Sequence, residues 1–584
     1  MRIPTRAIPR LALIGLIGAF AVSAAPASAD VPQENALPGS TLALLKINDT
    51  AAMREAAGNS QFGQLLADPA MQPLKADIEV KLEDFNRELK QRIGVTIAEL
   101  LETPQGPAWL AITRQEAELP FAVLIAADAG ENQAQMQEIM TKGTSELREQ
   151  DGEVSTEEFQ GLTLTVIKAP DEEQAPPLVW TNQESVYFIG TDVDAIKDLI
   201  ANADGREDSL AANANYTAIQ GKLDNDAHLS WFIDIGQVLR LVTQAGAEAG
   251  GDAQQVEARL QLFGINGLRA AGGCYTLTTG EYDSIAKTII YAPGPPQGVL
   301  RIFQMPVDAL PVEPWVPAET ASYQTLSWDL DAAYVALNDL VNMFLPGTLD
   351  NVERELGGLR FQQDIFGPLG NRITVVTDFK QPIDEDSQRA LFAIALDDAQ
   401  TFQNTLTKVI DLAGAAPKRR EFQGTTIYDF ELPNLPNPAG GPEGFDFDGL
   451  ISVAIAQEYL FVTTDTTLLE QVLRPGAANL SESAEFQSIR KQIPEQVSSF
   501  SYNRPDEQAR AVYNMVKGGQ LDQILEGANM AGVGNAPKLS DFIDVDKIPE
   551  FSVFAKYLTE SGGYSVMDED GLTLIQFTLR KNNP

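Results

Sequence analysis

The 584-residue chain contains one cysteine, Cys274, and one histidine, His228. A single cysteine excludes an intramolecular disulfide, a zinc site built from several thiolates and a Cys-x-x-Cys redox motif. A single histidine excludes zinc sites that need two or three imidazoles, among them the His-Glu-x-x-His proteases. The single cysteine and single histidine therefore exclude the most common types of zinc site and of thiol chemistry.

Basic residues are also scarce, with 42 Lys and Arg against 82 Asp and Glu, and the formal net charge is −40. Such a surface repels phosphate backbones, so we exclude nucleic acid as the main partner. The hydrophobic fraction of 44% is normal for a chain that buries a core, which excludes disorder as the main state. A chain of this length is expected to form at least two domains.

The sequence lacks two common motifs of catalytic or nucleotide-binding sites. No Gly-x-x-x-x-Gly-Lys-Ser/Thr phosphate loop occurs, and no Gly-x-Ser-x-Gly elbow accompanies His228. Leu229, Trp231 and Ile233 alternate after the histidine, which predicts a strand that buries these three side chains and turns His228 to solvent. We therefore assign no catalytic residue and no cofactor, and we expect that the chain is not an enzyme.

Acidic clusters leave the question of metal binding open. Asp446–Gly449 and Asp544–Asp546 contain closely spaced carboxylates, but neither continues as an EF-hand loop does. Asp568–Gly571 lies between two apolar segments, which predicts the turn of a β-hairpin. Metal ligands stay unknown at this level, as does calcium binding by the acidic loops.

The first 29 residues have the pattern of a secretory signal peptide. Arg2, Arg6 and Arg10 precede the apolar run 11–22, and Ala27–Ala29 provides a small-residue cleavage site. We expect cleavage after residue 29 and a periplasmic or secreted protein. No later run of 18 apolar residues occurs, so no membrane span is expected after cleavage.

The rest of the sequence repeats itself in order, which predicts a tandem duplication with copies at residues 30–310 and 311–584. Seven prolines between 292 and 317 mark the boundary, and Leu432–Gly449 is expected to be an insertion loop of the second copy. The matching segments, first copy then second, are 106–113 with 370–377, 121–129 with 392–399, 158–161 with 421–424, 188–192 with 461–465, 210–219 with 480–489, and 272–275 with 562–564.

Hydrophobic periods alternate between two and 3.6 residues within each copy, which predicts an α+β fold with largely antiparallel sheets covered by helices. Each copy is expected to begin with the β-α-β-β-α-β order of a ferredoxin-like module. The first copy is expected to have strands at 42–47, 108–113, 121–127, 162–167 and 186–189 and helices at 78–93 and 136–147.

Three short motifs carry a resemblance. They are Leu37-Pro38 before the 42–47 strand, Phe-Gln-Gly at 159–161 and 422–424, and Thr-Asp after the strands that end near 190 and 463. Together they resemble an uncharacterised family of exported bacterial proteins catalogued as a domain of unknown function. The resemblance covers most of the chain after residue 29 and implies no catalytic residues.

These observations favour a non-catalytic protein of the cell envelope, or a secreted protein, that presents a surface or groove to an envelope partner. A second hypothesis is a carrier of an apolar small molecule or lipid, lined by Met136, Met140 and Met343. A third is a hydrolase that uses two carboxylates, because 82 acidic residues can supply a pair that no local pattern reveals. The oligomeric state cannot be predicted from the sequence.

Overall fold

The computed structural model describes residues 31–93, 102–115, 120–149, 151–168, 176–248, 253–383, 387–412, 417–431, 450–523 and 538–581. The chain forms two compact units. Unit 1 comprises the residues up to Asp68 together with Ile78–Gln237 and Gly272–Gly280, and unit 2 comprises Pro69–Asp77, Val238–Ala271 and the chain from Glu281 onward. The fold mixes helices with a large antiparallel sheet.

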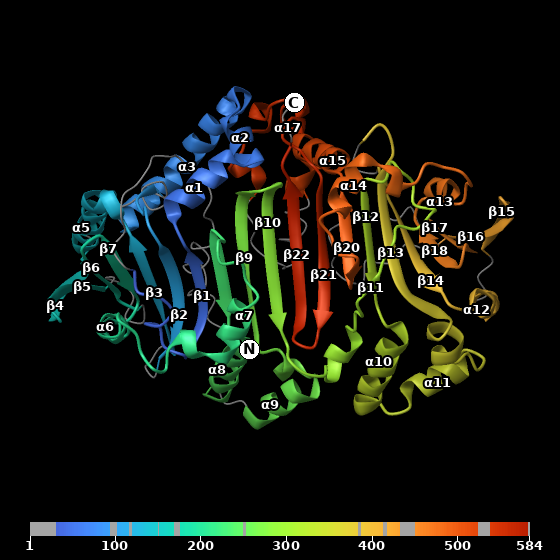
Figure 1. The fold of residues 1–584 in the computed structure, drawn as a ribbon, viewed down its shortest axis with the longest axis horizontal. Coiled ribbons are helices and arrows are strands. Elements are labelled where there is room, and N and C mark those ends of the chain that lie inside the picture. Colours follow the sequence, from blue (N-terminus) through green and yellow to red (C-terminus); the bar gives the residue numbers. More distant parts are fainter. Residues whose placement is uncertain are drawn as a thin grey trace. The chain divides into compact units, whose positions relative to one another are not determined.

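In unit 1 a sheet is flanked by helices, and its strands pair in the order β4-β5-β6-β7-β3-β2-β1-β8 (Figure 1). Each of these ladders is antiparallel. The elements of the first part of the chain are β1 Thr41–Ile47, α1 Thr50–Asn59, α2 Gln61–Ala67, α3 Gln72–Ile93, β2 Ala108–Arg114, β3 Phe121–Asp128, α5 Gln133–Glu149, β4 Glu153–Phe159, β5 Leu162–Lys168, β6 Leu178–Gln183, β7 Val186–Gly190, α6 Val193–Ala201, α7 Ala214–Gln220, β8 Leu229–Ile233, α8 Ile235–Glu248, α9 Ala253–Leu262 and β9 Ala270–Thr279.

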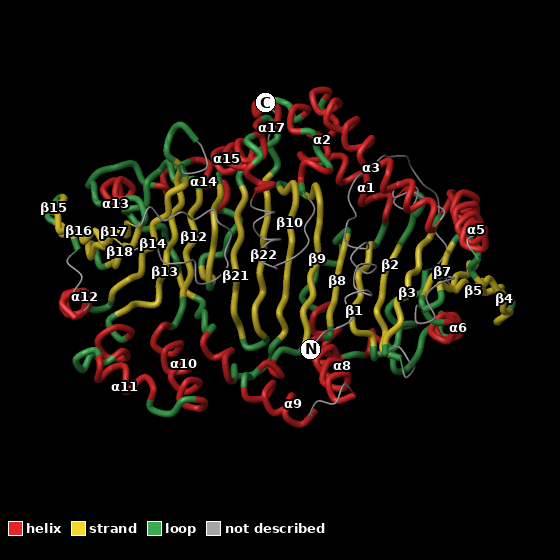
Figure 2. Tube along the Cα trace, turned by 180° about the vertical axis from the view of Figure 1, so that it is seen from behind, coloured by secondary structure: helices red, strands yellow, loops and turns green. Residues whose placement is uncertain are grey.

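In unit 2 the strands pair in the order β15-β16-β17-β18-β14-β13-β12-β20-β21-β22-β10, again antiparallel throughout (Figure 2). The elements are β10 Tyr282–Tyr291, β11 Asp308–Ala309, β12 Ser322–Ser327, α10 Leu330–Phe344, α11 Thr348–Glu355, β13 Leu369–Phe379, β14 Gln388–Leu396, α12 Ala399–Leu412, β15 Lys418–Phe422, β16 Thr425–Glu431, β17 Leu450–Ala456, β18 Tyr459–Thr463, α13 Thr466–Val472, α14 Ala484–Arg490, β19 Gln496–Val497, β20 Ser499–Asn503, α15 Pro505–Lys517, α17 Phe551–Ala555, β21 Ser561–Asp568 and β22 Gly571–Leu579.

The ladder from β4 to β8 and the ladder from β15 to β20 list corresponding strands in the same order. Single residues correspond as well. A Cβ added to Gly272 would lie 2.4 Å from Cγ2 of Ile219, and a Cβ added to Gly562 would lie 2.4 Å from Cγ2 of Ile489. β10 pairs along its length with β22, the last strand of the chain, although it precedes the predicted boundary at residue 310.

The predicted ferredoxin-like pairing is not the one that the strands adopt. The element order is close to the expected one, but β1 pairs directly with β2, whereas a split β-α-β module places another strand between them. The connection from β1 to β2 contains several helices, α1 to α3, and returns the chain antiparallel beside β1. Because the β2 side of β1 is already occupied, β8 completes its other side.

Tight hairpins place the outermost strands. Gln160 and Gly161 between β4 and β5 have φ of 49° and 82°, and Gln423 and Gly424 between β15 and β16 have φ of 51° and 80°. Two consecutive residues with positive φ form the turn that matches the twist of a two-residue hairpin, and glycine adopts this conformation without steric cost. The Phe-Gln-Gly motif is therefore a hairpin turn in both places.

Each unit has its own apolar core. In unit 2 the core joins Tyr323, Phe461, Phe486, Phe500 and other buried side chains of the sheet and its helices. In unit 1 the largest fully buried side chains include those of Tyr187 and Phe232. None of the helices in the described part of the chain combines the length and apolar character needed to cross a bilayer.

Candidate binding surface

The end of α10 carries four consecutive exposed apolar residues, Met343 to Pro346. The exposed fractions of Met343, Phe344 and Leu345 are 53%, 52% and 60%. Apolar side chains scattered singly over a surface are ordinary, but a continuous exposed run is a feature of binding sites. This run therefore is the first candidate for a functional surface.

Hydrogen bonds fix the shape of this turn. The Leu345 N–H donates to the Val341 carbonyl at 2.8 Å and closes the helix. The Gly347 N–H donates to Oδ1 of Asn342 at 3.0 Å, and Gly347 has a φ of 74°, which glycine tolerates. One face of the Phe344 ring stacks on Phe263, with centroids 5.7 Å apart. The apolar side chains are thus presented by an ordered turn.

Neighbouring elements of unit 2 add further exposed apolar side chains. Leu337 lies two helical turns before Phe344 on the same face of α10. Gly357, which follows α11, approaches the end of α12 so closely that an added Cβ would lie 3.2 Å from Cδ2 of Leu412. We use the term α10–α12 apolar surface for the exposed residues Leu337, Met343, Phe344, Leu345, Leu356, Val409 and Leu412.

Acidic residues accompany this surface. Residues 330–366 contain six acidic and two basic side chains. Asp339 forms an ion pair with Arg301 at 2.8 Å, and Arg360 lies 3.7 Å from Asp364. An apolar surface on a segment with more acidic than basic side chains favours a partner that offers apolar and basic groups.

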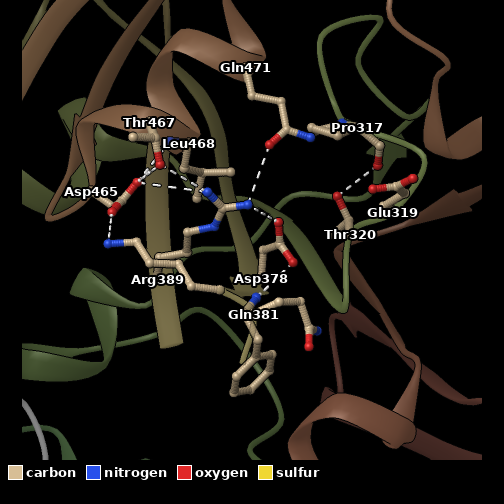
Figure 3. Close-up of polar contacts among 12 residues, drawn as sticks. Pro317, Glu319, Thr320, Asp378, Gln381, Arg389, Asp465, Thr467, Leu468 and Gln471 are labelled. Carbon is tan, nitrogen blue, oxygen red and sulfur yellow. Dashed lines mark hydrogen bonds and ion pairs between the residues drawn. The ribbon is translucent and has the colours of Figure 1, made fainter. Parts of the chain in front are cut away.

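A polar cluster lies at β13, β14 and the start of α13 (Figure 3). We call it the Arg389 cluster. Nη2 of Arg389 lies 2.6 Å from Oδ2 of Asp378, which is the residue directly opposite on β13. The same guanidinium donates to Thr467 Oγ1 at 3.1 Å and to Gln471 Oε1 at 3.4 Å. It therefore ties two strands to one helix.

Asp465 completes the Arg389 cluster. Its Oδ1 caps α13 by accepting the Leu468 N–H at 2.9 Å, and its Oδ2 lies 2.5 Å from Nζ of Lys380. Burial alone would raise the pKa of Asp465, but hydrogen bonds from Lys380 and Thr467 lower it below its ordinary value. Both oxygens already have donors, so this carboxylate is suited to hold α13 in place and not to act as a general base.

A second buried network, the Glu313 cluster, lies beneath β12 and β13. Oε1 of Glu313 accepts from Nε of Arg372 at 2.9 Å and from Thr374 Oγ1 at 2.5 Å. Oε2 accepts from the Tyr323 hydroxyl at 2.8 Å. Burial, followed by the nearby Glu313 carboxylate, raises the pKa of Tyr323 well above its ordinary value. In unit 1, Glu34 similarly pairs with Lys46 at 2.7 Å.

The structure corrects the prediction for His228. Phe232, not Ile233, lies on the buried face of β8, where it packs edge-to-face against Tyr216 with ring centroids 5.1 Å apart. Apolar residues occur on both faces of this strand, Leu229 and Trp231 on one and Phe232 on the other. The sequence pattern is therefore compatible with burial of either face. His228 is half-buried, and its Nδ1 accepts the Leu277 N–H at 3.1 Å.

A pH-dependent contribution to stability follows from this contact. Burial lowers the pKa of His228 below its ordinary value. The unfolded chain therefore takes up the proton first, and the stabilising contribution is complete above the unfolded pKa of about 6.5 and falls as the pH drops below it. We expect His228→Asn, whose Oδ1 can still accept the Leu277 N–H, to reduce the loss of stability between pH of about 7.5 and 5. Urea unfolding of both proteins at the two pH values measures the difference, and parallel losses would contradict it.

The other sequence candidates have separate local surroundings where the structure describes them. Cys274 is buried, with Sγ 3.9 Å from Oδ2 of Asp224. Met136 and Met140 pack with Tyr187 in unit 1, whereas Met343 is exposed in unit 2. Asp446–Gly449 and the predicted insertion loop Leu432–Gly449 lie outside the described residues.

The acidic loops that the structure does describe have local roles. Asp544 caps a short helical turn by accepting the Asp546 N–H at 3.0 Å. Asp568 lies opposite Gly571 where β21 turns into β22, which confirms the predicted hairpin. Within the described residues, no group of three or more His, Cys, Asp or Glu side chains is arranged to hold a metal ion.

Comparisons with known proteins give one similarity. No curated protein matches the chain, and no solved structure matches it. One family model, described as a protein of unknown function (DUF3352), matches residues 349–526, which run from α11 past α15 and lie within the predicted second copy. A DUF3352 domain of unknown function is therefore found at residues 349–526.

Proposed function

We propose that the chain is a non-catalytic binding protein that acts in the cell envelope or outside the cell, and that the α10–α12 apolar surface contacts a protein partner. The observation that carries this proposal is the exposed run from Met343 to Pro346 on a turn fixed by hydrogen bonds. Ordering an interface costs free energy on binding, and a turn that is already ordered avoids part of that cost.

Two further observations support a binding role over a hydrolytic one. The carboxylates of Asp378 and Asp465, both in the Arg389 cluster, are engaged by Arg389, Lys380 and backbone N–H groups. A general base or nucleophile needs an oxygen that can reach substrate. Export rests on residues 1–29, whose charged, apolar and small-residue segments follow the order of a signal peptide.

We also propose that residues 30–310 and 311–584 are two copies of one module. The common ladder order, the paired hairpin turns and the matching environments of Gly272 and Gly562 support a duplication. The α10–α12 surface belongs to the second copy, so the copies would share a scaffold and differ in what they bind.

Site-specific photo-crosslinking tests the binding role. A photo-crosslinking residue introduced at Phe344 in the native cell is expected to give one discrete protein adduct, and Leu345→Asp in the same chain is expected to remove it. The matched control is the same residue introduced at Phe62, an exposed phenylalanine on α2 of unit 1. Equal adducts from both positions, or none from Phe344, would contradict the proposal. Crosslinking to lipid alone would favour the carrier instead.

A further inference from the structure

Each unit ends its ladder in an edge strand, β4 in unit 1 and β15 in unit 2. Among the described strands, β4 pairs with β5 alone and β15 pairs with β16 alone. The outer backbone N–H and carbonyl groups of such a strand can accept another strand, and natural proteins control this with charged side chains. The charges on these two edges therefore decide what can pair with them.

The two edge strands carry opposite charge. β4, with the sequence EVSTEEF, contains Glu153, Glu157 and Glu158 and no basic residue. β15, with the sequence KRREF, begins with Lys418, Arg419 and Arg420. In a chain with a net charge of −40, this is the only run of three consecutive basic residues. A basic edge on such an acidic chain calls for a specific explanation.

Corresponding ion pairs have reversed polarity in the two units. On β4, Glu157 lies 2.5 Å from Lys197 of α6. On β15, Arg420 lies 2.6 Å from Glu470 of α13. The hairpins that follow are alike, because Glu158 accepts from Thr163 and Glu421 accepts from Thr426 at the same distance of 2.7 Å. The edges therefore share their backbone geometry and differ in the sign of their charge.

We infer that β4 of one molecule pairs with β15 of a second copy of this chain, as an added antiparallel strand. With Glu157 opposite Arg420, Glu158 lies opposite Arg419, and Thr156 lies opposite Glu421, so no like charges face each other. Pairing of β4 with β4, or of β15 with β15, offers no match of an acidic strand with a basic one, so the mixed pair is favoured. β4 and β15 include none of the residues of the α10–α12 apolar surface, and the inference does not depend on the proposed function.

Screening lengths explain why complementary charges on two strands can favour association although the whole chain is strongly acidic. At an ionic strength of about 0.15 M the Debye length is about 8 Å, so most of the repulsion between two distant acidic surfaces is screened. Neighbouring strands lie only about 5 Å apart, within this length. Because the two edges differ, the contact is heterologous, and a dimer retains one free β4 and one free β15.

Charge reversal provides the test, with sedimentation velocity of the chain lacking residues 1–29 as the measurement. Variant A carries Glu153→Lys and Glu158→Lys, and variant B carries Lys418→Glu and Arg419→Glu; both leave the ion pairs of Glu157 and Arg420 intact. We expect the unmodified chain to associate as its concentration rises at physiological ionic strength. Variants A and B alone are expected to lose this association.

An equimolar mixture of A and B is expected to associate again, because each basic edge then meets an acidic one. This recovery also shows that both variants are folded. A control, Glu131→Lys with Glu207→Lys, changes the net charge as variant A does at exposed positions away from β4 and is expected to associate like the unmodified chain. A monomeric unmodified chain, association of A or B alone, or no recovery on mixing would overturn the inference.

Discussion

Replacing Arg372 by methionine is expected to lower the free energy of unfolding by about 3–5 kcal/mol, because it leaves the buried carboxylate of Glu313 without its cation. The Glu313 side chain is 2% exposed, and Arg372 is the cation that contacts it. Tyr323 and Thr374 can still donate hydrogen bonds, but neither neutralises the charge. Denaturant unfolding of the purified protein measures the loss.

Arg301→Met serves as the control for this prediction. Arg301 also pairs with one carboxylate, Asp339, but both side chains are more than a third exposed. Exposed ion pairs contribute about 1 kcal/mol or less. The double variant of Glu313→Gln and Arg372→Met is expected to regain part of the loss, because it removes the unpaired charge. If the loss of unfolding free energy were no larger than that of Arg301→Met, the Glu313 carboxylate would not be buried as described.

Gly272→Ala and Gly562→Ala are each expected to lower the free energy of unfolding by about 1–3 kcal/mol, the usual cost of overpacking a filled site. The new Cβ would lie 2.4 Å from Cγ2 of Ile219 or Ile489, and a backbone carbonyl oxygen lies within 3.1 Å in both places. Both isoleucines are fully buried and cannot move outward. Similar losses for the two variants would match their similar surroundings.

The same substitution at Gly58 provides the control. Gly58 lies near the end of α1, and nothing occupies the space around an added Cβ. Alanine there is expected to be neutral or stabilising, because alanine favours the helix over glycine. Combining Gly562→Ala with Ile489→Leu, which lacks Cγ2, is expected to recover part of the loss. An unchanged loss in the double variant would assign the strain to the backbone contact instead.

Apolar periodicity predicted the buried elements well. The segments 121–127 and 186–189 correspond to β3 and β7, and the helix expected at 78–93 lies within α3, Gln72–Ile93. β4 and β15 were missed, because an edge strand whose side chains mostly face solvent has no apolar alternation to detect. The signal that could have found them is the Phe-Gln-Gly turn at the end of each.

The candidate surface could not be predicted from the pattern alone. Met343, Phe344 and Leu345 continue an apolar helical segment in the sequence, and only the packing of α10 against its neighbours shows which apolar side chains remain uncovered. The face of His228 was wrong for a related reason, since Trp231 and Phe232 are adjacent apolar residues and the contact with Tyr216 selects one of them. The order in which the strands pair was mispredicted for a similar reason, because the strand that lies beside β1 is selected by contacts distant in sequence.

The pairing of β10 with β22 has a consequence for the order in which the chain folds. Ile285 lies opposite Phe577, so everything between these residues must be synthesised before the ladder can close. A ribosome delivers the chain from its N-terminus, so the edge of β10 that faces β22 lacks its partner while the second half of the chain is synthesised. Contacts this distant in sequence form slowly, and an exposed strand invites aggregation meanwhile. Premature termination before residue 571 would remove β22 and leave this edge of β10 open, so we expect such a product to aggregate.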